Sequence, residues 1–372
     1  MRILLDYRPA LRERTGVGEY VHEVARALAP SAPANEALTL FSSSYKDRLN
    51  SPGIPGTTIV DRRIPVTLLN FAWHRLEWPP VERLAGGSFD VVHATHPLLI
   101  PSRDAARVVT IYDLDFLDHP ERTRAEIRRD YPALAARHAQ RADHVVTISN
   151  HTARAIESRF GVEPARISIC YPGAPSWPAR EAEPAQGCVL FLGSLVPRKN
   201  LGTLLDAYER LITRMPAAPP LVLAGGQSEE SAPIAARVSR PPLAGRVELT
   251  GYVPPAERAA LYRRAIVFVM PSFTEGFGIP VIEAMTTGVP VVAANRGALP
   301  EAVGGAGRLV EAEDADALAT HLQQLLADPA ERRRLAELGR VHARKFTWAA
   351  AAKGVREAWT RAVASKGSTG RG

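Results

Sequence analysis

Short runs of apolar, often β-branched residues alternate along the first half of the chain with segments that repeat at the period of a helix. The runs have the length of buried parallel strands and lie at residues 2–7, 37–42, 90–96, 107–113, 143–149 and 167–173. After the first run, residues 19–29 place their apolar side chains on one stripe, namely Tyr20, Val21, Val24, Ala27 and Leu28. The pattern predicts that the chain opens with a β–α unit and continues as an α/β domain.

The same alternation starts again after a segment that has no period. Residues 176–187, rich in proline, alanine and charge, predict a linker between two domains. Further strand-like runs follow at residues 188–194, 221–226, 246–252, 266–272 and 289–295, with helical patterns such as 201–215 and 255–265 between them. Both halves therefore predict an α/β fold of two Rossmann-like, doubly wound domains. We expect these domains at residues 1–175 and 188–345, a helix over 346–364 that crosses back to the first domain, and a disordered tail at 365–372.

The composition is that of a folded protein rather than a disordered or fibrous one. Of the 372 residues, 46% are hydrophobic and 23% are charged, and the length favours two domains. Cys170 and Cys188 have neither the spacing of a metal site nor that of a disulfide framework, so we expect a reducing, cytoplasmic location. The first apolar run soon meets Asp6 and Arg8, which predicts a strand rather than a signal peptide. No segment is apolar over the length that a membrane span needs.

The formal net charge of +7 leaves three classes of partner open: nucleic acid, an anionic lipid surface, or a phosphorylated small molecule. The positive charge is spread over both halves, and no motif interleaves aromatic with basic residues. This distribution argues against nucleic acid binding.

Two glutamates stand in an otherwise apolar or small segment, SFTEGFGIPVIEAMTTGVPVV, at residues 272–292. Glu275 falls in the loop after a strand, and Glu283 falls in the first turns of the next helix. Backbone N–H groups at such a helix N-terminus favour an anion such as a phosphate. Each glutamate alone could simply complement the helix dipole. The pair favours a ligand site, because Gly276 and Gly278 let a backbone approach closely and carboxylates accept hydrogen bonds from sugar hydroxyls.

A second candidate site lies between the strand that ends at Gly193 and the helix that begins at Leu201. Arg198 and Lys199 lie in this junction, and the lysine is informative because the chain has only five lysines among its 46 basic residues. Paired cations at a strand–helix junction suit a diphosphate, since a guanidinium offers a fork of donors and an ammonium a compact charge. The alternative is a solvated loop.

Gly16 and Gly18 precede the first long helix. Such a pair can admit a phosphate or a sugar ring, but it also forms common tight turns. The full G-x-G-x-x-G pattern of dinucleotide-binding proteins fails because its third position is Val21, and the chain has no P-loop motif.

Two further patterns carry side chains that can bind metals. Asp113 and Asp115 form a D-x-D triplet, which arises often by chance. His93 and His96 follow a strand three residues apart, but they would need a third converging ligand to hold a metal ion. A role for these histidines in packing or in lining a site is the alternative.

Several segments of the chain resemble the retaining family-4 glycosyltransferases of the GT-B fold, and in particular their mannosyltransferase-like branch. They are TGVGEY, GSLVPRKNLGTLLDAY, LAGG, LTGYVPPAERAALYRRA and, above all, PSFTEGFGIPVIEAMTTGVPVVAANRGALPEAVGGAG. The E-x7-E signature of this family matches Glu275 and Glu283 in spacing and neighbours. The chain departs from the pattern at Tyr112, where mannosyltransferase-like relatives often carry a histidine before Asp113.

The resemblance implies two domains that face a cleft, and a sugar nucleotide held mainly by the second domain. Arg198 and Lys199 are implied to bind its diphosphate, Glu283 its ribose and Glu275 the transferred sugar. The other implied donor-binding residues are Gly193, Tyr252, Val253, Gly276, Phe277, Gly278 and Ile279. The implied catalytic residues are Glu275, Asp113 and His93, and the implied acceptor side comprises Gly16, Gly18, Tyr112 and Ser149. Neither a metal ion nor a cofactor is implied, because the cationic loop stabilises the leaving diphosphate while the acceptor hydroxyl attacks from the same face.

The branch that the chain resembles favours GDP-mannose as donor, with a UDP-sugar as the alternative. The implied acceptor is a glycan or a lipid-linked intermediate of surface polysaccharide assembly. The arginine-rich residues 120–143, with Arg124, Arg128 and Arg129, could contact the inner face of the membrane, although a solvated helix face is the alternative. A sugar-nucleotide epimerase and a non-catalytic nucleotide-binding module are the rival classes that share this fold.

Overall fold

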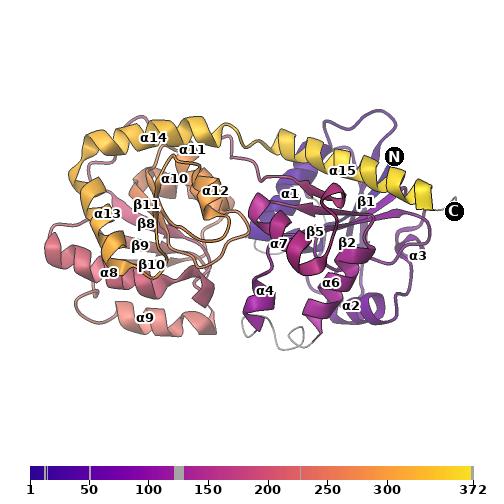
Figure 1. Cartoon of the computed structure of the whole chain (residues 1–372), viewed down its shortest axis with the longest axis horizontal. Coiled ribbons are helices and arrows are strands. Elements are labelled where there is room, and N and C mark those ends of the chain that lie inside the picture. Colours follow the sequence, from indigo (N-terminus) through magenta and orange to yellow (C-terminus); the bar gives the residue numbers. More distant parts are fainter. Residues whose placement is uncertain (12–13, 15, 50–51, 121–129, 227, 370–372) are drawn as a thin grey trace. The chain divides into compact units, whose positions relative to one another are not determined.

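The computed structural model describes residues 1–11, 14, 16–49, 52–120, 130–226 and 228–369. The chain divides into two units (Figure 1). Unit 1 comprises residues 1–173 and 348–372, and unit 2 comprises residues 174–347. Each unit holds one parallel sheet covered by helices, which confirms the predicted α/β fold of two Rossmann-like domains.

The sheet of unit 1 has, among the described residues, seven parallel strands in the order β3-β2-β1-β4-β5-β6-β7. These are β1 (Arg2–Asp6), β2 (Ala37–Ser43), β3 (Thr57–Arg62), β4 (Val91–Ala94), β5 (Ala106–Ile111), β6 (His144–Thr147) and β7 (Ile167–Ile169). The helices are α1 (Gly16–Leu28), α2 (Val66–Arg75), α3 (Val81–Ala85), α4 (Asp115–Asp118), α6 (Tyr131–Arg141), α7 (Asn150–Phe160) and α15 (Trp348–Thr369), with 3₁₀ turns η1 (Arg8–Ala10) and η3 (Pro164–Arg166). The central strands are buried on both faces, which explains why they are continuous apolar runs.

The sheet of unit 2 has six parallel strands within the described part of the chain, in the order β10-β9-β8-β11-β12-β13. They are β8 (Cys188–Leu192), β9 (Leu221–Ala224), β10 (Val247–Gly251), β11 (Ala265–Met270), β12 (Val291–Ala294) and β13 (Arg308–Val310). The helices are α8 (Leu201–Arg214), α9 (Ala232–Val238), α10 (Pro255–Arg264), α11 (Ile279–Thr286), α12 (Leu299–Val303), α13 (Ala315–Ala327) and α14 (Pro329–Ala343), with 3₁₀ turns η4 (Pro197–Lys199) and η5 (Glu229–Ser231).

Both sheets have a point at which the strand order reverses. In unit 1 the chain proceeds outward from β1 to β2 and β3 and then returns to place β4 on the other side of β1. In unit 2 the same reversal lies between β8 and β11. Ligands of open α/β sheets bind at the carboxyl ends of the two strands on either side of such a point.

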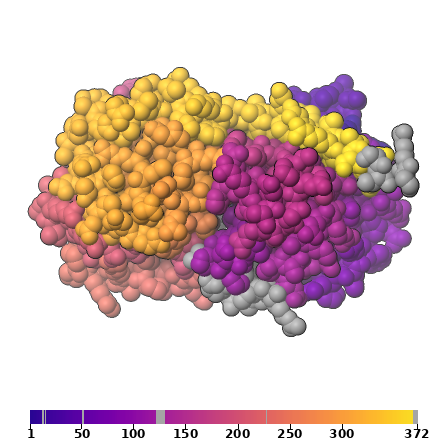
Figure 2. Space-filling model, in the orientation of Figure 1, coloured from indigo at the N-terminus to yellow at the C-terminus, as the bar shows by residue number. Residues whose placement is uncertain are grey.

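The last helix of the chain belongs to unit 1, where α15 packs against α1 and against β4 to β7. Its outer side forms part of the molecular surface (yellow in Figure 2). The helix ends at Thr369, so residues 365–369, for which we predicted disorder, are helical. The physical reason is a tertiary contact, because Lys366 donates a hydrogen bond from Nζ to the carbonyl of Ala105 at 2.8 Å. Residues 174–187, which include the predicted linker, form neither helix nor strand and belong to unit 2.

A tryptophan anchors α15 to the sheet. Trp359 is fully buried, and its Nε1–H donates a hydrogen bond to Nδ1 of His93 on β4 at 3.0 Å. We expect Trp359→Phe to lower the free energy of unfolding by about 1–3 kcal/mol, because it leaves the buried imidazole nitrogen without its donor. Chemical denaturation followed by circular dichroism measures the change. Trp348→Phe, which removes an indole with no such hydrogen bond, is the matched control, and equal effects of the two changes would contradict this explanation.

Candidate functional site

The two candidate sites of unit 2 come together at its switch point. Arg198 and Lys199 lie in η4 after β8, and Glu275 lies in the loop after β11, the neighbouring strand. Lys199 Nζ donates to Glu275 Oε1 at 2.5 Å. Arg198 donates from one guanidinium nitrogen to Glu275 Oε2 and to the carbonyl of Thr274, each at 3.2 Å. The carboxylate and the two cations, 76 and 77 residues apart in sequence, therefore form one cluster.

This cluster is largely shielded from water. The relative exposure of Glu275 is 7% and that of Lys199 is 6%. Burial by itself would raise the pKa of Glu275, but the charges of Lys199 and Arg198 and the hydrogen bonds to the carboxylate outweigh it and lower the pKa to about 2. Glu275 is thus a stable carboxylate at neutral pH, poorly suited to accept a proton.

The depressed pKa of Glu275 makes an acid-dependent contribution to stability. A carboxylate with a pKa of about 2 in the folded chain and about 4.5 in the unfolded chain stabilises the fold above pH 4.5, and this stabilisation disappears as the pH falls toward 2. The expected size of this loss is about 3 kcal/mol. Urea denaturation of the wild type and of Glu275→Gln, measured between pH 6 and pH 2.5, tests it. The stability difference between the two proteins should shrink on acidification, and a constant difference would contradict the assignment.

Glu283 lies in α11 and is held by two side chains of α10 that sequence analysis did not single out. Arg258 donates to its Oε1 at 3.3 Å, and the hydroxyl of Tyr262 donates to its Oε2 at 2.8 Å. Burial and the adjacent carboxylate raise the pKa of Tyr262, so its hydroxyl remains a donor. Arg258 and Tyr262 are four residues apart, which places them on one face of a helix. The sequence spacing predicts that Arg258 and Tyr262 share this face, but it does not predict that the face contacts Glu283.

The loop between the two glutamates offers its backbone more than its side chains. Gly278, the N-cap of α11, has φ of 113°, and a β-carbon there would lie 3.0 Å from Leu299. Phe277 is buried and packs edge-on against Phe346, with ring centroids 5.2 Å apart. The predicted role of Phe277 in binding a ligand is therefore restricted to its backbone. Gly276, which precedes Phe277, and Ile279, which follows Gly278, are both half-buried.

Close backbone packing also shapes the carboxyl ends of β8 and β9. A β-carbon on Gly225 would lie 2.0 Å from the carbonyl oxygen of Gly193, so the two strand ends approach each other only because residue 225 is a glycine. Lys199 lies next to Gly193, since a β-carbon there would be 3.6 Å from Lys199 Nζ. Gly193 thus lies beside the cluster of Lys199, Arg198 and Glu275. Tyr252 and Val253 lie half-buried after β10, which β9 separates from β8.

In unit 1 the predicted catalytic residue His93 is a packing residue. It is 2% exposed, its Nδ1 accepts the hydrogen bond from Trp359, and its Nε2 pairs with the hydroxyl of Thr110 at 2.8 Å. Burial lowers its pKa to about 3, which keeps the ring neutral. Both ring nitrogens therefore form hydrogen bonds inside the unit, which argues against the predicted catalytic role of His93.

Ser149 and Tyr112, predicted on the acceptor side, lie after β6 and β5, and Asp113, predicted to be catalytic, follows Tyr112. The hydroxyl of Thr152 links the first two, because it accepts from Ser149 Oγ at 3.0 Å and donates to the carbonyl of Tyr112 at 3.2 Å. Ser149 is fully buried as the N-cap of α7, where its Oγ accepts from the backbone N–H of Thr152 at 3.1 Å. Asp113 is half-buried after β5 and accepts from the backbone N–H of Asp115 at 3.2 Å. The hydroxyl of Tyr112 is buried without a hydrogen-bond partner in the described part of the chain.

The two glycines at the start of α1 have different surroundings. Gly18 is buried where α1 crosses η1, because a β-carbon there would lie 2.7 Å from the carbonyl oxygen of Pro9. Gly16 is exposed, with open space around its α-carbon. Packing thus accounts for Gly18, whereas Gly16 is accessible to a ligand.

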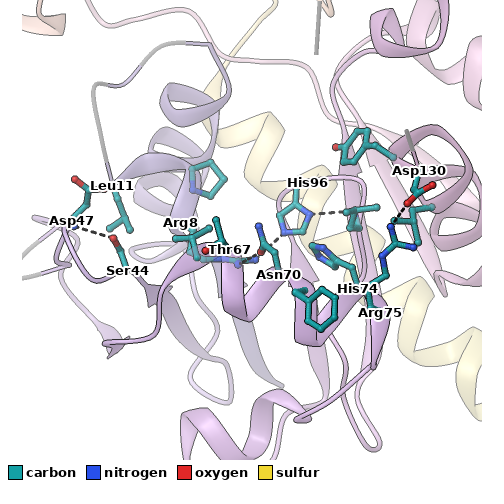
Figure 3. Close-up of a pocket in the computed structure, with 16 residues that line it drawn as sticks. Arg8, Leu11, Ser44, Asp47, Thr67, Asn70, His74, Arg75, His96 and Asp130 are labelled. Carbon is teal, nitrogen blue, oxygen red and sulfur yellow. Dashed lines mark hydrogen bonds and ion pairs between the residues drawn. The ribbon is translucent and has the colours of Figure 1, made fainter. Parts of the chain in front are cut away.

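A pocket of about 740 Å³ lies at the switch point of unit 1 (Figure 3). Asp6 at the end of β1 is fully buried and accepts hydrogen bonds on both oxygens from Arg8, at 2.8 Å each. Arg8 also donates to Asn70 Oδ1 at 2.9 Å, and His96 Nε2 lies 3.1 Å from Asp6 Oδ2. His74 lines the same pocket, and its buried Nε2 has no hydrogen-bond partner among the described residues. The pair of Asp6 and Arg8 is local in sequence, but the pocket was not predicted because Asn70 and His96 lie 62 and 88 residues from Arg8.

This pocket is polar but nearly neutral in charge. Arg8 is neutralised by Asp6, and Arg75 at the rim is paired with Asp130. Burial, together with the charges of His96 and Arg8, lowers the pKa of His74 to about 2, so that ring is neutral. Apolar walls complete the pocket, formed by Leu11, Val66, Phe71, Leu98 and Leu134. Such a lining suits an uncharged, hydroxyl-rich ligand better than a strong anion.

No helix in the described part of the chain is both long and apolar enough to cross a bilayer. No group of three or more His, Cys, Asp or Glu side chains there is arranged to hold a metal ion. The predicted basic segment with Arg124, Arg128 and Arg129 lies outside the described residues.

Two family models that describe glycosyltransferases match the chain, one on each of its two Rossmann-like domains. Residues 14–176 match the family model described as Glycosyltransferase Family 4, and residues 186–328 match the model described as Glycosyl transferases group 1. The chain belongs to the family-4 glycosyltransferases.

Known relatives cover nearly the whole chain. It is 29% identical over 373 residues to the O-antigen chain mannosyltransferase B of Escherichia coli, covering 94% of this chain and 96% of the relative. It is 28% identical over 404 residues to the D-inositol 3-phosphate glycosyltransferase of Thermobifida fusca (strain YX), covering 96% and 91%. The structure of sucrose-phosphate synthase from Thermosynechococcus elongatus superposes with a TM-score of 0.78 at 22% identity, covering 96% of this chain and 97% of that one. The last comparison bears on the fold alone.

Proposed function

We propose that this protein transfers mannose from GDP-mannose to a glycan or lipid-linked acceptor in surface polysaccharide assembly, with retention of the anomeric configuration. The observation that carries the proposal is the cluster of Lys199, Arg198 and Glu275 at the switch point of unit 2. The similarity to an O-antigen mannosyltransferase over nearly the full chain supports the sugar and the pathway.

In this proposal the cations of the cluster bind the diphosphate of the donor. Lys199 supplies a compact charge, and Arg198, half-exposed, supplies further N–H donors beyond those that Glu275 uses. As the bond from the anomeric carbon to the phosphate oxygen breaks, negative charge builds up on that oxygen. Fixed positive charge at this point stabilises the transition state more than the ground state. This is the role that a divalent cation fills in other enzymes, and it is why we propose transfer without one.

In this proposal Glu275 contacts the transferred sugar but does not act as a nucleophile. Its carboxylate is held by two cations and has a pKa of about 2, so its lone pairs are only weakly basic. We therefore propose that no covalent sugar–enzyme intermediate forms. The acceptor hydroxyl attacks the anomeric carbon on the face that the diphosphate leaves, and its proton passes to the departing phosphate oxygen. Glu283, fixed by Arg258 and Tyr262, accepts hydrogen bonds from the ribose hydroxyls.

The pocket of unit 1 is the proposed site of the acceptor sugar. Its 740 Å³ is of the size that binds small ligands, and its paired charges leave it neutral. The hydroxyl of Thr67 and the free nitrogen of His74 are available there as hydrogen-bond partners for sugar hydroxyls. Arg8 and His96, both held by Asp6, line the pocket (Figure 3).

Calorimetric titration with GDP and, separately, with UDP tests the donor. We expect GDP to bind more tightly, and binding to be lost in Lys199→Ala and weakened in Glu283→Ala, with thermal melting as a control for folding. Tighter binding of UDP, lost in the same variants, would establish the site but replace the donor by a UDP-sugar. If neither nucleotide binds to the folded protein, the transferase proposal fails and a non-catalytic module becomes the better account. The anomeric configuration of the product, read by NMR, tests retention.

A further inference from the structure

Most of the large apolar side chains that the described residues leave exposed lie between residues 45 and 78, around α2 of unit 1. Leu68, Phe71, Leu76 and Trp78 are 58%, 58%, 62% and 56% exposed, and together they are called the α2 apolar surface below. Scattered exposed apolar residues are ordinary, but several on one short helix and the turn after it mark an interaction site.

The spacing along α2 explains how this surface arises. Leu69 and Trp73, four residues apart, are buried, and Trp73 packs on Phe41 of β2 with ring centroids 5.6 Å apart. Leu68, Phe71 and Arg75 follow the spacing i, i+3 and i+7 on another side of the helix, which is exposed. A helix that buried a single apolar stripe would carry polar residues at these positions. The sequence of α2 therefore provides for two apolar contacts, of which the structure satisfies one.

Basic residues surround the α2 apolar surface. Arg62 ends β3, and Arg63 follows it in the connection to α2. Arg83 places its guanidinium 5.9 Å from the centre of the Trp78 ring, and Lys46 lies between Ser44 and Asp47, which both line the pocket. All four are exposed, and none has a carboxylate partner among the described residues. Two acidic neighbours are neutralised, because Glu77 pairs with Arg141 and Asp61 with Arg48. Glu82, beside Arg83, accepts a hydrogen bond from Ser102, and Asp47 lies beside Lys46. Lys46, Arg62, Arg63 and Arg83 thus supply positive charge beside the α2 apolar surface. This combination of apolar and basic side chains binds an anionic bilayer surface.

The α2 apolar surface is continuous with the pocket of unit 1. Thr67, Asn70 and His74 form a third side of the helix, which lines the pocket, and Phe71 both lines the pocket and lies on the exposed side. A lipid-linked acceptor could thus place its sugar in the pocket while its hydrocarbon chain leaves over Phe71 toward the membrane.

We propose that α2 docks unit 1 onto an anionic lipid bilayer, with the α2 apolar surface in the headgroup region and Lys46, Arg62, Arg63 and Arg83 on the lipid phosphates. The docking itself is independent of the proposed function. Delivery of the acceptor along Phe71 rests on that function.

Vesicle flotation of the full chain tests the docking. The probes are vesicles of phosphatidylcholine alone and vesicles with one third phosphatidylglycerol. We expect binding to the anionic vesicles that weakens at high salt. Binding should be at least tenfold weaker for Leu68→Glu/Leu76→Glu, which changes two side chains that do not line the pocket. The matched control is Leu338→Glu/Val341→Glu on α14, where the same chemistry is introduced at side chains 40% and 50% exposed. The control should bind like the wild type.

Variants that lose only positive charge measure the electrostatic contribution to vesicle binding. Lys46→Gln/Arg63→Gln should weaken binding to anionic vesicles by about fivefold per charge, whereas Arg333→Gln/Lys353→Gln, at exposed positions elsewhere, should have little effect. Failure of the wild type to bind, or equal loss in the α2 and α14 variants, would overturn the proposal. So would light scattering that shows a dimer of the wild type broken by Leu68→Glu/Leu76→Glu, because the surface would then join two copies.

Nucleotide titration of the same variants keeps this inference separate from the proposed function. Since the donor cluster lies in unit 2, Leu68→Glu/Leu76→Glu should bind GDP or UDP like the wild type. Loss of vesicle binding with intact nucleotide binding supports the docking. Nucleotide binding without vesicle binding in the wild type overturns the docking alone.

Discussion

Lys199→Ala is expected to lower the rate of sugar transfer by about a factor of 10²–10³, because it removes a fixed charge from the point where the leaving phosphate becomes negative. Its ammonium is 6% exposed and lies 2.5 Å from Glu275, so neither water nor a mobile side chain can easily replace it. Arg198 remains and will retain part of the affinity for the diphosphate. The loss should therefore appear in kcat as well as in KM, measured by release of nucleoside diphosphate in the presence of acceptor.

The loss of a buried ion-pair partner also affects stability, and the controls must separate the two effects. Leaving Glu275 without Lys199 can cost about 3–5 kcal/mol when a buried charge is left unpaired, although the contact with Arg198 reduces this cost. Assays below the melting temperature of the variant, checked by circular dichroism, distinguish a folded, inactive protein from an unfolded one. Lys353→Ala, at an exposed lysine of α15, is the matched control and should leave activity unchanged. Near-normal transfer by folded Lys199→Ala would exclude the proposed role of Lys199.

The fold was predictable because buried parallel strands appear as unbroken apolar runs and amphipathic helices as a 3.6-residue repeat. Both signals are local. The same local signals located Lys199 and Glu275 immediately after strands, and the strand order then placed them on neighbouring strands. The contact between them, across 76 residues, was not in the pattern. The resemblance to a family implied only that both residues bind the same sugar nucleotide.

The wrong assignment of His93 shows where local patterns fail. A histidine at the end of a strand has the same sequence signature whether it faces a ligand or the core. The deciding partner, Trp359, lies 266 residues away on a helix at the end of the chain. The pocket of unit 1 was missed for the same reason, since Arg8 meets Asn70 and His96 at separations of 62 and 88 residues. The exposure of the apolar side chains on α2 could not be predicted either, because the sequence does not distinguish a buried leucine from an exposed one.

The switch points of the two sheets are topologically equivalent, but they carry a different balance of charge. At the switch point of unit 1, one carboxylate balances one guanidinium, in the pair of Asp6 with Arg8. At that of unit 2, one carboxylate faces two cations, which leaves a net positive charge. The first arrangement suits a neutral sugar and the second a diphosphate. A single fold, repeated, can thus hold an acceptor and a donor by changing the balance of charge at one equivalent place.

The excess charge in unit 2 leads to a prediction in which binding and catalysis separate. Glu275→Gln should lower the rate of transfer by about a factor of 10²–10³, because the amide cannot accept the sugar hydroxyls as strongly or stabilise positive charge that develops on the sugar ring. Affinity for the nucleoside diphosphate alone should stay equal or increase, since Lys199 and Arg198 no longer share their charge with a carboxylate. Calorimetry and a transfer assay on the same preparation measure both.

A merely structural role for Glu275 would give a different result. If the carboxylate only holds the loop in place, Glu275→Gln should weaken nucleotide binding and transfer together, in proportion to the loss of folded protein. Glu313→Gln, which removes a carboxylate from an exposed pair with Arg296, is the matched control and should change neither quantity. Tight binding combined with slow transfer therefore identifies a residue that acts on the sugar in the transition state, because the donor site remains intact while the reaction is slowed.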